Sequence, residues 1–234
     1  MPVKKVIDGA TAVHDGVLKA ISLQRLAPGT RLPEENLARI FAVGRGPVRS
    51  ALARLKQRGL VRMEPNRSAE IATYSVAEVH GLFDVRRWIE PEVAADVAHI
   101  LTPSQLTHLK SHLDDEQAAR DAGDRIEATR LSGLFHTELA RCSPNMIARR
   151  YISELVDQSF LAIYLYQRVG VFMCVNEDHL DLIATLESGD PDRARRSMRD
   201  HLDHILERLD LSEKGEENED LEQAFAGVIQ TPGS

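Results

Sequence analysis

Three histidines stand in three separate segments of helical periodicity, each where the apolar pattern faces inward: His136, His179 and His201. Imidazole nitrogens are good ligands for divalent transition metals, and three of them on facing helices can surround one ion. The residues alone favour a plainer interpretation, in which the histidines are unrelated core or surface side chains. A metal site is therefore one of two interpretations at this point.

A second group of side chains is basic and lies in the segment GRGPVR, residues 44–49. Arg45 and Arg49 are four residues apart, so a helix presents both on one face. Arginine suits the paired acceptors of guanine and the oxygens of phosphate. Gly46 leaves the backbone free to approach DNA, and Arg67 at the tip of a predicted hairpin can reach the adjacent minor groove. The segment predicts a DNA-reading helix, and the alternative is a set of ordinary surface charges.

The elements that position these arginines follow from apolar spacing and from helix-ending residues. The pattern predicts a helix over 11–22, a loop over 26–33, a second helix from Pro33 to Gly44, and a third helix that has Pro47 at its first position and ends at Gly59. Two short β-stretches around Pro65-Asn66 predict a hairpin. This order of elements on a basic segment favours a DNA-reading helix over a set of ordinary surface charges.

From residue 75 onward the pattern is helical almost without interruption. Ser75 and Glu78 predict a capping box that opens a helix to about Leu101. Further helices are predicted over 102–123, 124–142, 144–168, 173–188 and 191–211. Helices of these lengths form an antiparallel bundle of six helices, or of seven if the tail adds one. The protein is thus predicted to be mainly α, with domains at 1–74 and 75–212 and an acidic tail at 213–234 that is disordered or holds a short docking helix.

The charge is distributed unevenly along the 234 residues. The formal net charge is −7, yet residues 1–74 contain 13 Lys/Arg and 6 Asp/Glu, while the remainder contains 16 and 30. A basic module on an acidic body suits a protein in which one part contacts phosphates and the other has another task. The absence of an apolar run of ~20 residues and of a secretory signal predicts a cytoplasmic protein without membrane contact. The sequence also lacks an HExxH motif, a nucleophile elbow and a P-loop, which argues against an enzyme.

The N-terminal segment resembles the winged helix of GntR-type bacterial regulators. The usual pattern contains L-x-E-x-x-L-A, then R-x-P-V-R-x-A-L and G-L-V, and this chain matches it from Gly29 to Val61. The resemblance implies a winged helix-turn-helix on double-stranded DNA, with Glu34 joining Arg45, Gly46, Arg49 and Arg67 in the DNA-binding set. Gly44 replaces the usual hydroxyl residue, and Ser68 replaces the usual wing glycine. These two departures put the operator sequence in doubt, while both arginines are retained.

The C-terminal segment resembles the all-helical FCD effector domain of the FadR-like subfamily, on the segments FDVRRWIE (83–90), FH (135–136), EDH (177–179) and MRDHL (198–202). The resemblance implies that the three histidines hold a divalent ion, Zn²⁺ or Ni²⁺. The family's usual aspartate, four residues before the first histidine, is Ser132 here, which removes a negative charge from the site. Arg86 and Glu90 form either a helix ion pair or, with Arg86 at a cavity wall, a contact for an effector carboxylate. Arg86 and Ser132 are the predicted effector-binding residues.

These observations predict a ligand-responsive transcription regulator, most simply a repressor. It would bind a pseudo-palindromic operator as a homodimer and respond to a small carboxylate. Two alternatives remain open at this stage. One is a metal-dependent enzyme that uses the three-histidine cavity, although Glu177 and Asp178, which adjoin His179, are expected to point elsewhere on their helix. The other is an architectural DNA binder that does not respond to a ligand.

Overall fold

The computed structural model describes residues 8–168 and 176–211. These residues form two compact units, which divide between Thr73 and Tyr74. The predicted tail at 213–234 and the first three residues of the helix predicted over 173–188 lie outside the described residues. None of the helices within the described ranges is both long enough and apolar enough to cross a membrane.

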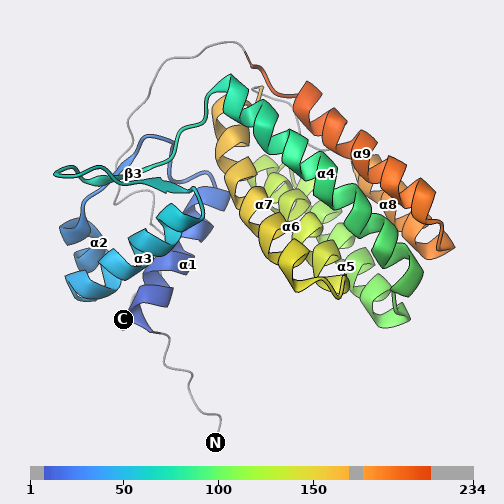
Figure 1. The fold of residues 1–234 in the computed structure, drawn as a ribbon, viewed down its shortest axis with the longest axis horizontal. Coiled ribbons are helices and arrows are strands. Elements are labelled where there is room, and N and C mark those ends of the chain that lie inside the picture. The colour runs from blue at the N-terminus through green and yellow to red at the C-terminus, as the bar shows by residue number, and fades with distance from the viewer. Residues whose placement is uncertain (1–7, 169–175, 212–234) are drawn as a thin grey trace, which may run out of the picture. The chain divides into compact units, whose positions relative to one another are not determined.

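The first unit is a helix-turn-helix with a small sheet (Figure 1). Its elements are α1 (Gly9–Ser22), β1 (Arg31–Leu32), α2 (Glu34–Ile40), α3 (Arg45–Gln57), β2 (Val61–Arg62) and β3 (Ala69–Ile71). The three strands are antiparallel in the order β1-β3-β2. Apolar side chains at helical spacing, such as Val17, Leu37 and Leu52, are fully buried between the helices. The predicted hairpin and the predicted helices before it are thereby confirmed as a winged helix-turn-helix.

Two sequence predictions in this unit were wrong in detail. Residues 31–32 were predicted as loop but form β1, because β3 offers them a pairing edge that no local pattern reveals. Pro47 was predicted at the first helical position, whereas α3 begins at Arg45 and places the proline third. The proline is still accommodated there, because the first-turn backbone N–H groups of a helix have no partner within the helix.

The second unit is a bundle of six helices over its described residues (Figure 1). They are α4 (Val76–Ile100), α5 (Pro103–Asp121), α6 (Arg125–Cys142), α7 (Met146–Tyr166), α8 (Asn176–Ser188) and α9 (Pro191–Glu207). The predicted capping box of Ser75 and Glu78 is present, and Thr102 with Gln105 forms a second one. Helix α4 packs along α9, and α5 packs along α6. Helix α4 also contacts α6 and α8, and α8 contacts α9, so these four helices share an interior.

Candidate metal centre and effector pocket

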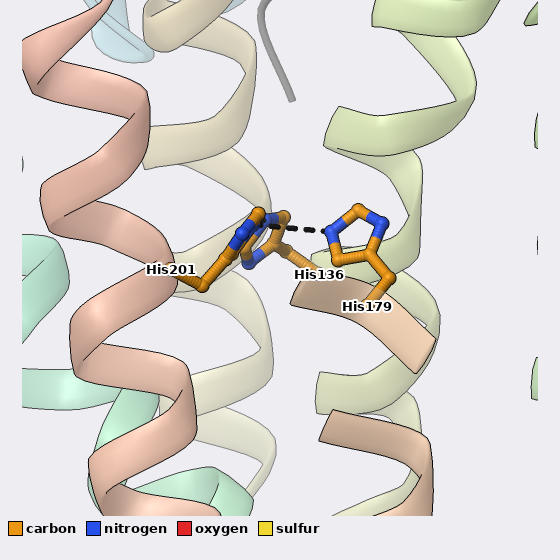
Figure 2. A group of neighbouring side chains, drawn as sticks. All are labelled: His136, His179 and His201. Carbon is orange, nitrogen blue, oxygen red and sulfur yellow. Dashed lines mark hydrogen bonds between the residues drawn. The ribbon is translucent and has the colours of Figure 1, made fainter. Parts of the chain in front are cut away.

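The three predicted histidines meet inside the bundle, from three different helices (Figure 2). His136 on α6, His179 on α8 and His201 on α9 are each at least 98% buried. The Nε2 atom of His201 lies 3.1 Å from Nε2 of His136 and 3.1 Å from Nε2 of His179. One ring nitrogen of each histidine lies within 4.8 Å of the other two. Two nitrogens at ~2.0–2.1 Å from one tetrahedral ion are about 3.3 Å apart, so the cluster has the span of a metal site.

Each of the three rings has a carboxylate behind it, at the nitrogen that faces away from the cluster. His136 Nδ1 lies 2.5 Å from Glu90 Oε2, His179 Nδ1 lies 2.9 Å from Glu116 Oε2, and His201 Nδ1 lies 3.4 Å from Asp178 Oδ2. An ionised carboxylate only accepts hydrogen bonds, so the facing Nδ1 must carry the proton. In a neutral ring the lone pair is then on Nε2. Three lone pairs therefore converge, an arrangement that a cation between them would stabilise.

The protonation of the pair Glu90 and His136 suits this arrangement. Burial alone would raise the pKa of Glu90, but the charge of Arg86 and the contact with His136 outweigh it and lower that pKa to about 2. Burial lowers the pKa of His136 to about 3, although the neighbouring Glu90 opposes the shift. Near neutral pH, Glu90 is therefore ionised and His136 is neutral, which is the form that binds metals.

Glu116 has the same character at the second ring. Burial would raise its pKa, but the hydrogen bond and charge of His179 and the contact with Arg120 lower it to about 2. The pKa of Asp178 is also lowered, because its hydrogen bonds to His201 and His204 outweigh its partial burial. All three carboxylates are thus acceptors near neutral pH.

A small pocket opens beside His136. Its lining includes Arg86 from α4, Ser132 from α6 and Ser159 from α7, together with apolar side chains of α7 and α9. The Ser132 side chain is 95% buried and lies one helical turn before His136. The pocket therefore combines a guanidinium, the hydroxyls of Thr129, Ser132 and Ser159, and one edge of the histidine cluster.

The position of Arg86 agrees with both interpretations that the sequence left open, a helix ion pair and a place at a cavity wall. It forms an ion pair with Glu90, four residues later, with Nε 2.5 Å from Oε1. It also lines the pocket, and its NH1 donates to Ser159 Oγ at 3.1 Å. Because both charges are buried, this pair differs from the solvated helix pair, worth a few tenths of a kcal/mol, that the spacing alone predicts.

Four of the predicted DNA-contacting residues are exposed on the first unit, and the fifth, Glu34, is half-buried. Arg45 is the first residue of α3 and Arg49 lies one turn later. Arg49 Nε donates to both oxygens of Glu34, at 2.9 and 2.7 Å, and Arg45 lies 3.5 Å from Glu35. A Cβ added at Gly46 would meet nothing in the chain within 4 Å. Packing within this unit therefore does not require a glycine at position 46. The space in front of its Cα is open to an external partner.

Arg67 lies in the turn between β2 and β3, where Asn66 has a positive φ of 61°. Its side chain is 76% exposed, and its guanidinium forms an ion pair with Glu64 at 2.9 Å. The wing thus presents a basic side chain to solvent, as the hairpin prediction requires.

Sequence reasoning missed the carboxylates behind the histidines. Asp178 was expected to point away from the histidines, whereas it contacts His201 and also His204. Glu116 was not considered, because it lies 63 residues from His179. A signal did exist, since Glu116 continues the apolar spacing of Leu109 and Leu113 on α5, and a carboxylate at a core position requires a partner.

Comparison with known proteins identifies both units. Residues 10–71 match the profile of bacterial regulatory proteins of the gntR family, and residues 81–204 match that of the FCD domain. The chain is 29% identical over 185 residues to the HTH-type transcriptional repressor RspR of Escherichia coli (strain K12), covering 79% of this chain and 81% of the relative. It is 26% identical to the HTH-type transcriptional repressor NanR of Enterobacter sp. (strain 638), covering 82% of each.

Solved structures share the fold. E. coli McbR/YncC matches with a TM-score of 0.74 at 21% identity, over 85% of this chain and 95% of that one. A putative GntR transcriptional regulator from Rhodococcus sp. RHA1 matches with a TM-score of 0.72 at 20% identity, over the same shares. The order of a winged helix and an all-helical domain is therefore common to this chain and to both structures.

Proposed function

Because the chain belongs to the GntR family of bacterial regulatory proteins and carries an FCD domain, we propose that it is a repressor controlled by a small carboxylate beside a metal-loaded histidine cluster. The winged unit binds operator DNA, and the FCD unit responds to a small-molecule effector. The convergence of three Nε2 atoms beside an arginine-lined pocket carries the proposal.

The metal part of the proposal rests on the donor set. His136, His179 and His201 would hold a divalent ion, with Zn²⁺ and Ni²⁺ suited to imidazole donors. Three protein ligands leave positions for an external oxygen. When bound, the ion supplies positive charge at the edge of the pocket. Ser132, in place of the family's usual aspartate, adds no charge to offset it.

The effector part of the proposal rests on Arg86 and the hydroxyls that line the pocket. A carboxylate in the pocket would accept hydrogen bonds from Ser132 and from the arginine, while a second oxygen faces the histidines. The small pocket and the apolar residues around it favour a compact organic acid. The effector must bind the DNA-releasing arrangement better than the other, because equal affinity shifts nothing.

A homodimer is proposed for the DNA-bound form. Two winged units on one pseudo-palindromic operator require two chains. Large apolar side chains are exposed on α4 and α7, which pack against each other: Trp88 is 70% exposed and Tyr151 is 47% exposed. Contiguous exposed apolar patches are typical of interaction faces, and we propose that these two side chains belong to the dimer contact. Light scattering should give twice the chain mass of 26.1 kDa.

DNA binding measured with and without metal tests the proposal. The chain, purified without chelator, is analysed for bound metals and titrated against an operator selected from a random duplex library. Metal content should approach one ion per chain, and one acid of a carboxylate panel should weaken operator binding only in the loaded form. His201→Gln should abolish metal binding, while His108→Gln, which changes an exposed histidine paired with Glu138, should retain it. Absence of metal from both the wild type and this control would contradict the proposal.

The enzyme alternative has less support. The relatives are transcription regulators, and both carboxylates closest to the cluster, Glu90 and Glu116, are tied to a histidine and an arginine. A carboxylate held in this way is a poor general base. We therefore propose that the pocket binds its ligand without transforming it, which recovery of the unchanged effector after incubation would test.

A further inference from the structure

Glu90 contacts both halves of the site at once. One oxygen, Oε2, lies 2.5 Å from Nδ1 of His136, and the other, Oε1, lies 2.5 Å from Nε of Arg86. All three side chains are at least 97% buried. Arg86 lines the pocket, while His136 presents its other nitrogen to the histidine cluster. The carboxylate is therefore the direct link between the pocket arginine and one candidate metal ligand.

Glu116 forms a similar link on the other side of the cluster. Its Oε2 lies 2.9 Å from Nδ1 of His179, and its Oε1 lies 2.7 Å from NH2 of Arg120. Neither Glu116 nor Arg120 is among the residues that line the pocket beside His136. The fold thus contains two buried Arg–Glu–His units, and one of them reaches the pocket. This pair provides a matched comparison within one chain.

We propose that Glu90 is a positioning residue that couples the metal ion to the carboxylate effector. The proposal rests on the proposed function, because it assumes that the histidines hold an ion and that Arg86 contacts the effector. A carboxylate that pairs with Arg86 shares the guanidinium with Glu90. The charge that Glu90 offers to the Nδ1 proton of His136 then changes, and with it the basicity of the ligand nitrogen. By linkage, the ion changes effector affinity by the same factor as the effector changes ion affinity.

The chemistry of this link requires a carboxylate. Glu90 accepts from the His136 ring and from the Arg86 guanidinium, both of which are donors. A glutamine has the same shape but offers one acceptor oxygen and one NH₂ donor. It can serve one partner only, and its NH₂ group must face a donor at the other. Glu90→Gln therefore breaks the link while it keeps the volume of the side chain.

Cobalt binding with acetate as the carboxylate probe tests the proposal in the full-length protein. Co²⁺ affinity is measured by competition with a chelator, and acetate affinity by the visible absorption of the Co²⁺-loaded protein. Glu90→Gln and Glu116→Gln should each weaken Co²⁺ binding by about 10–100-fold, because each removes a partner of a ligand histidine. Acetate affinity of the loaded protein should rise at least about tenfold in Glu90→Gln, because the buried Arg86 is then no longer shared with a second carboxylate and its charge is uncompensated. It should change less than about threefold in Glu116→Gln, because the arginine that pairs with Glu116 does not line the pocket.

The outcomes separate the two levels of the proposal. Equal changes of acetate affinity in the two variants, or no change in either, overturn the coupling role of Glu90 and leave the metal site standing. A wild-type protein that binds no Co²⁺, or whose loaded form does not respond to acetate, overturns the proposed function and the coupling with it. Glu90→Asp is a second variant that keeps the charge but is one methylene shorter. Its acetate affinity should change in the same direction as in Glu90→Gln, because the shorter carboxylate cannot reach both Arg86 and His136, and wild-type affinity in this variant would count against the coupling.

Discussion

Arg49 is expected to read the operator, and its geometry allows the size of the effect to be worked out. Both of its recorded hydrogen bonds use Nε, which donates to the two oxygens of Glu34. The side chain is 67% exposed, so the terminal amino groups can face a guanine edge or a phosphate. A bidentate contact to guanine contributes about 1–3 kcal/mol of discrimination. Arg49→Ala should cost that amount at each half-site, or about 2–6 kcal/mol for a dimer on two half-sites.

Fluorescence anisotropy on a selected operator measures this loss. Arg54→Ala is the matched control, because Arg54 lies on the same helix and is exposed but sits five residues further from the start of α3 than Arg49. Both variants lose one positive charge. A phosphate contact weakens all sequences equally and lowers the salt slope, whereas a base contact also relaxes preference at one position. Equal affinities of the two variants at the same salt would refute a reading role for Arg49.

Glu34 can act in two opposite ways, and the sign of one measurement decides between them. If it aligns Arg49, Glu34→Gln should weaken operator binding, because glutamine offers a single acceptor to Nε. It should then have no further effect in an Arg49→Ala background, since coupled residues are not additive. If Glu34 instead competes with DNA for the arginine, its neutralisation should tighten binding. Tighter binding would therefore contradict an alignment role for Glu34.

Three further results are expected. Ser132→Asp should strengthen metal binding about tenfold or more, because it adds an anionic donor one turn from His136. The variant should also respond less to carboxylates. An unchanged metal affinity in chelator competition would count against the site. Gly16→Ala should destabilise the winged unit by about 1–3 kcal/mol in urea unfolding, because its Cβ would lie 2.5 Å from the ring of Phe41, whereas Gly46→Ala should be neutral or stabilising. The metal-free protein should lose stability as pH falls from 6.5 towards 3, because the pKa of His136 is lowered in the folded state and the unfolded state therefore binds more protons. The slope from this residue is up to about 1.4 kcal/mol per pH unit, and a flat urea-unfolding profile between pH 7 and 5 would contradict it.

The helices could be predicted from the sequence because their ends carry local chemistry. Ser75 with Glu78 forms a capping box, and Pro103 opens α5 after the cap at Thr102. Such signals act over three or four residues and do not depend on the rest of the chain. Strand β1 had no such signal, because two residues cannot display an alternating pattern. Its existence depends on pairing with Ala69 and Glu70, almost forty residues later.

The site was only partly predictable for a similar reason. The three histidines could be grouped only because the chain resembles a family, since residues 136, 179 and 201 have no common local pattern. Their carboxylate partners lie 23 to 63 residues away from them. Helical periodicity assigns a residue to a face of its own helix, but it does not assign partners on other helices. Glu90 is the clearest case, because the i, i+4 pair with Arg86 was visible and its second partner, His136, was not.

The balance of buried charge explains why an anion should complete this site. Glu90 is neutralised by Arg86, and Glu116 is neutralised by Arg120. The histidines are neutral when they bind a metal, and Ser132 contributes no charge. An ion of charge +2 would therefore be offset only in part, by the ionised Asp178 behind His201, in a buried position where uncompensated charge is costly. A carboxylate lowers that cost and a neutral ligand does not, so anions should raise Co²⁺ affinity while neutral ligands of similar size leave it unchanged.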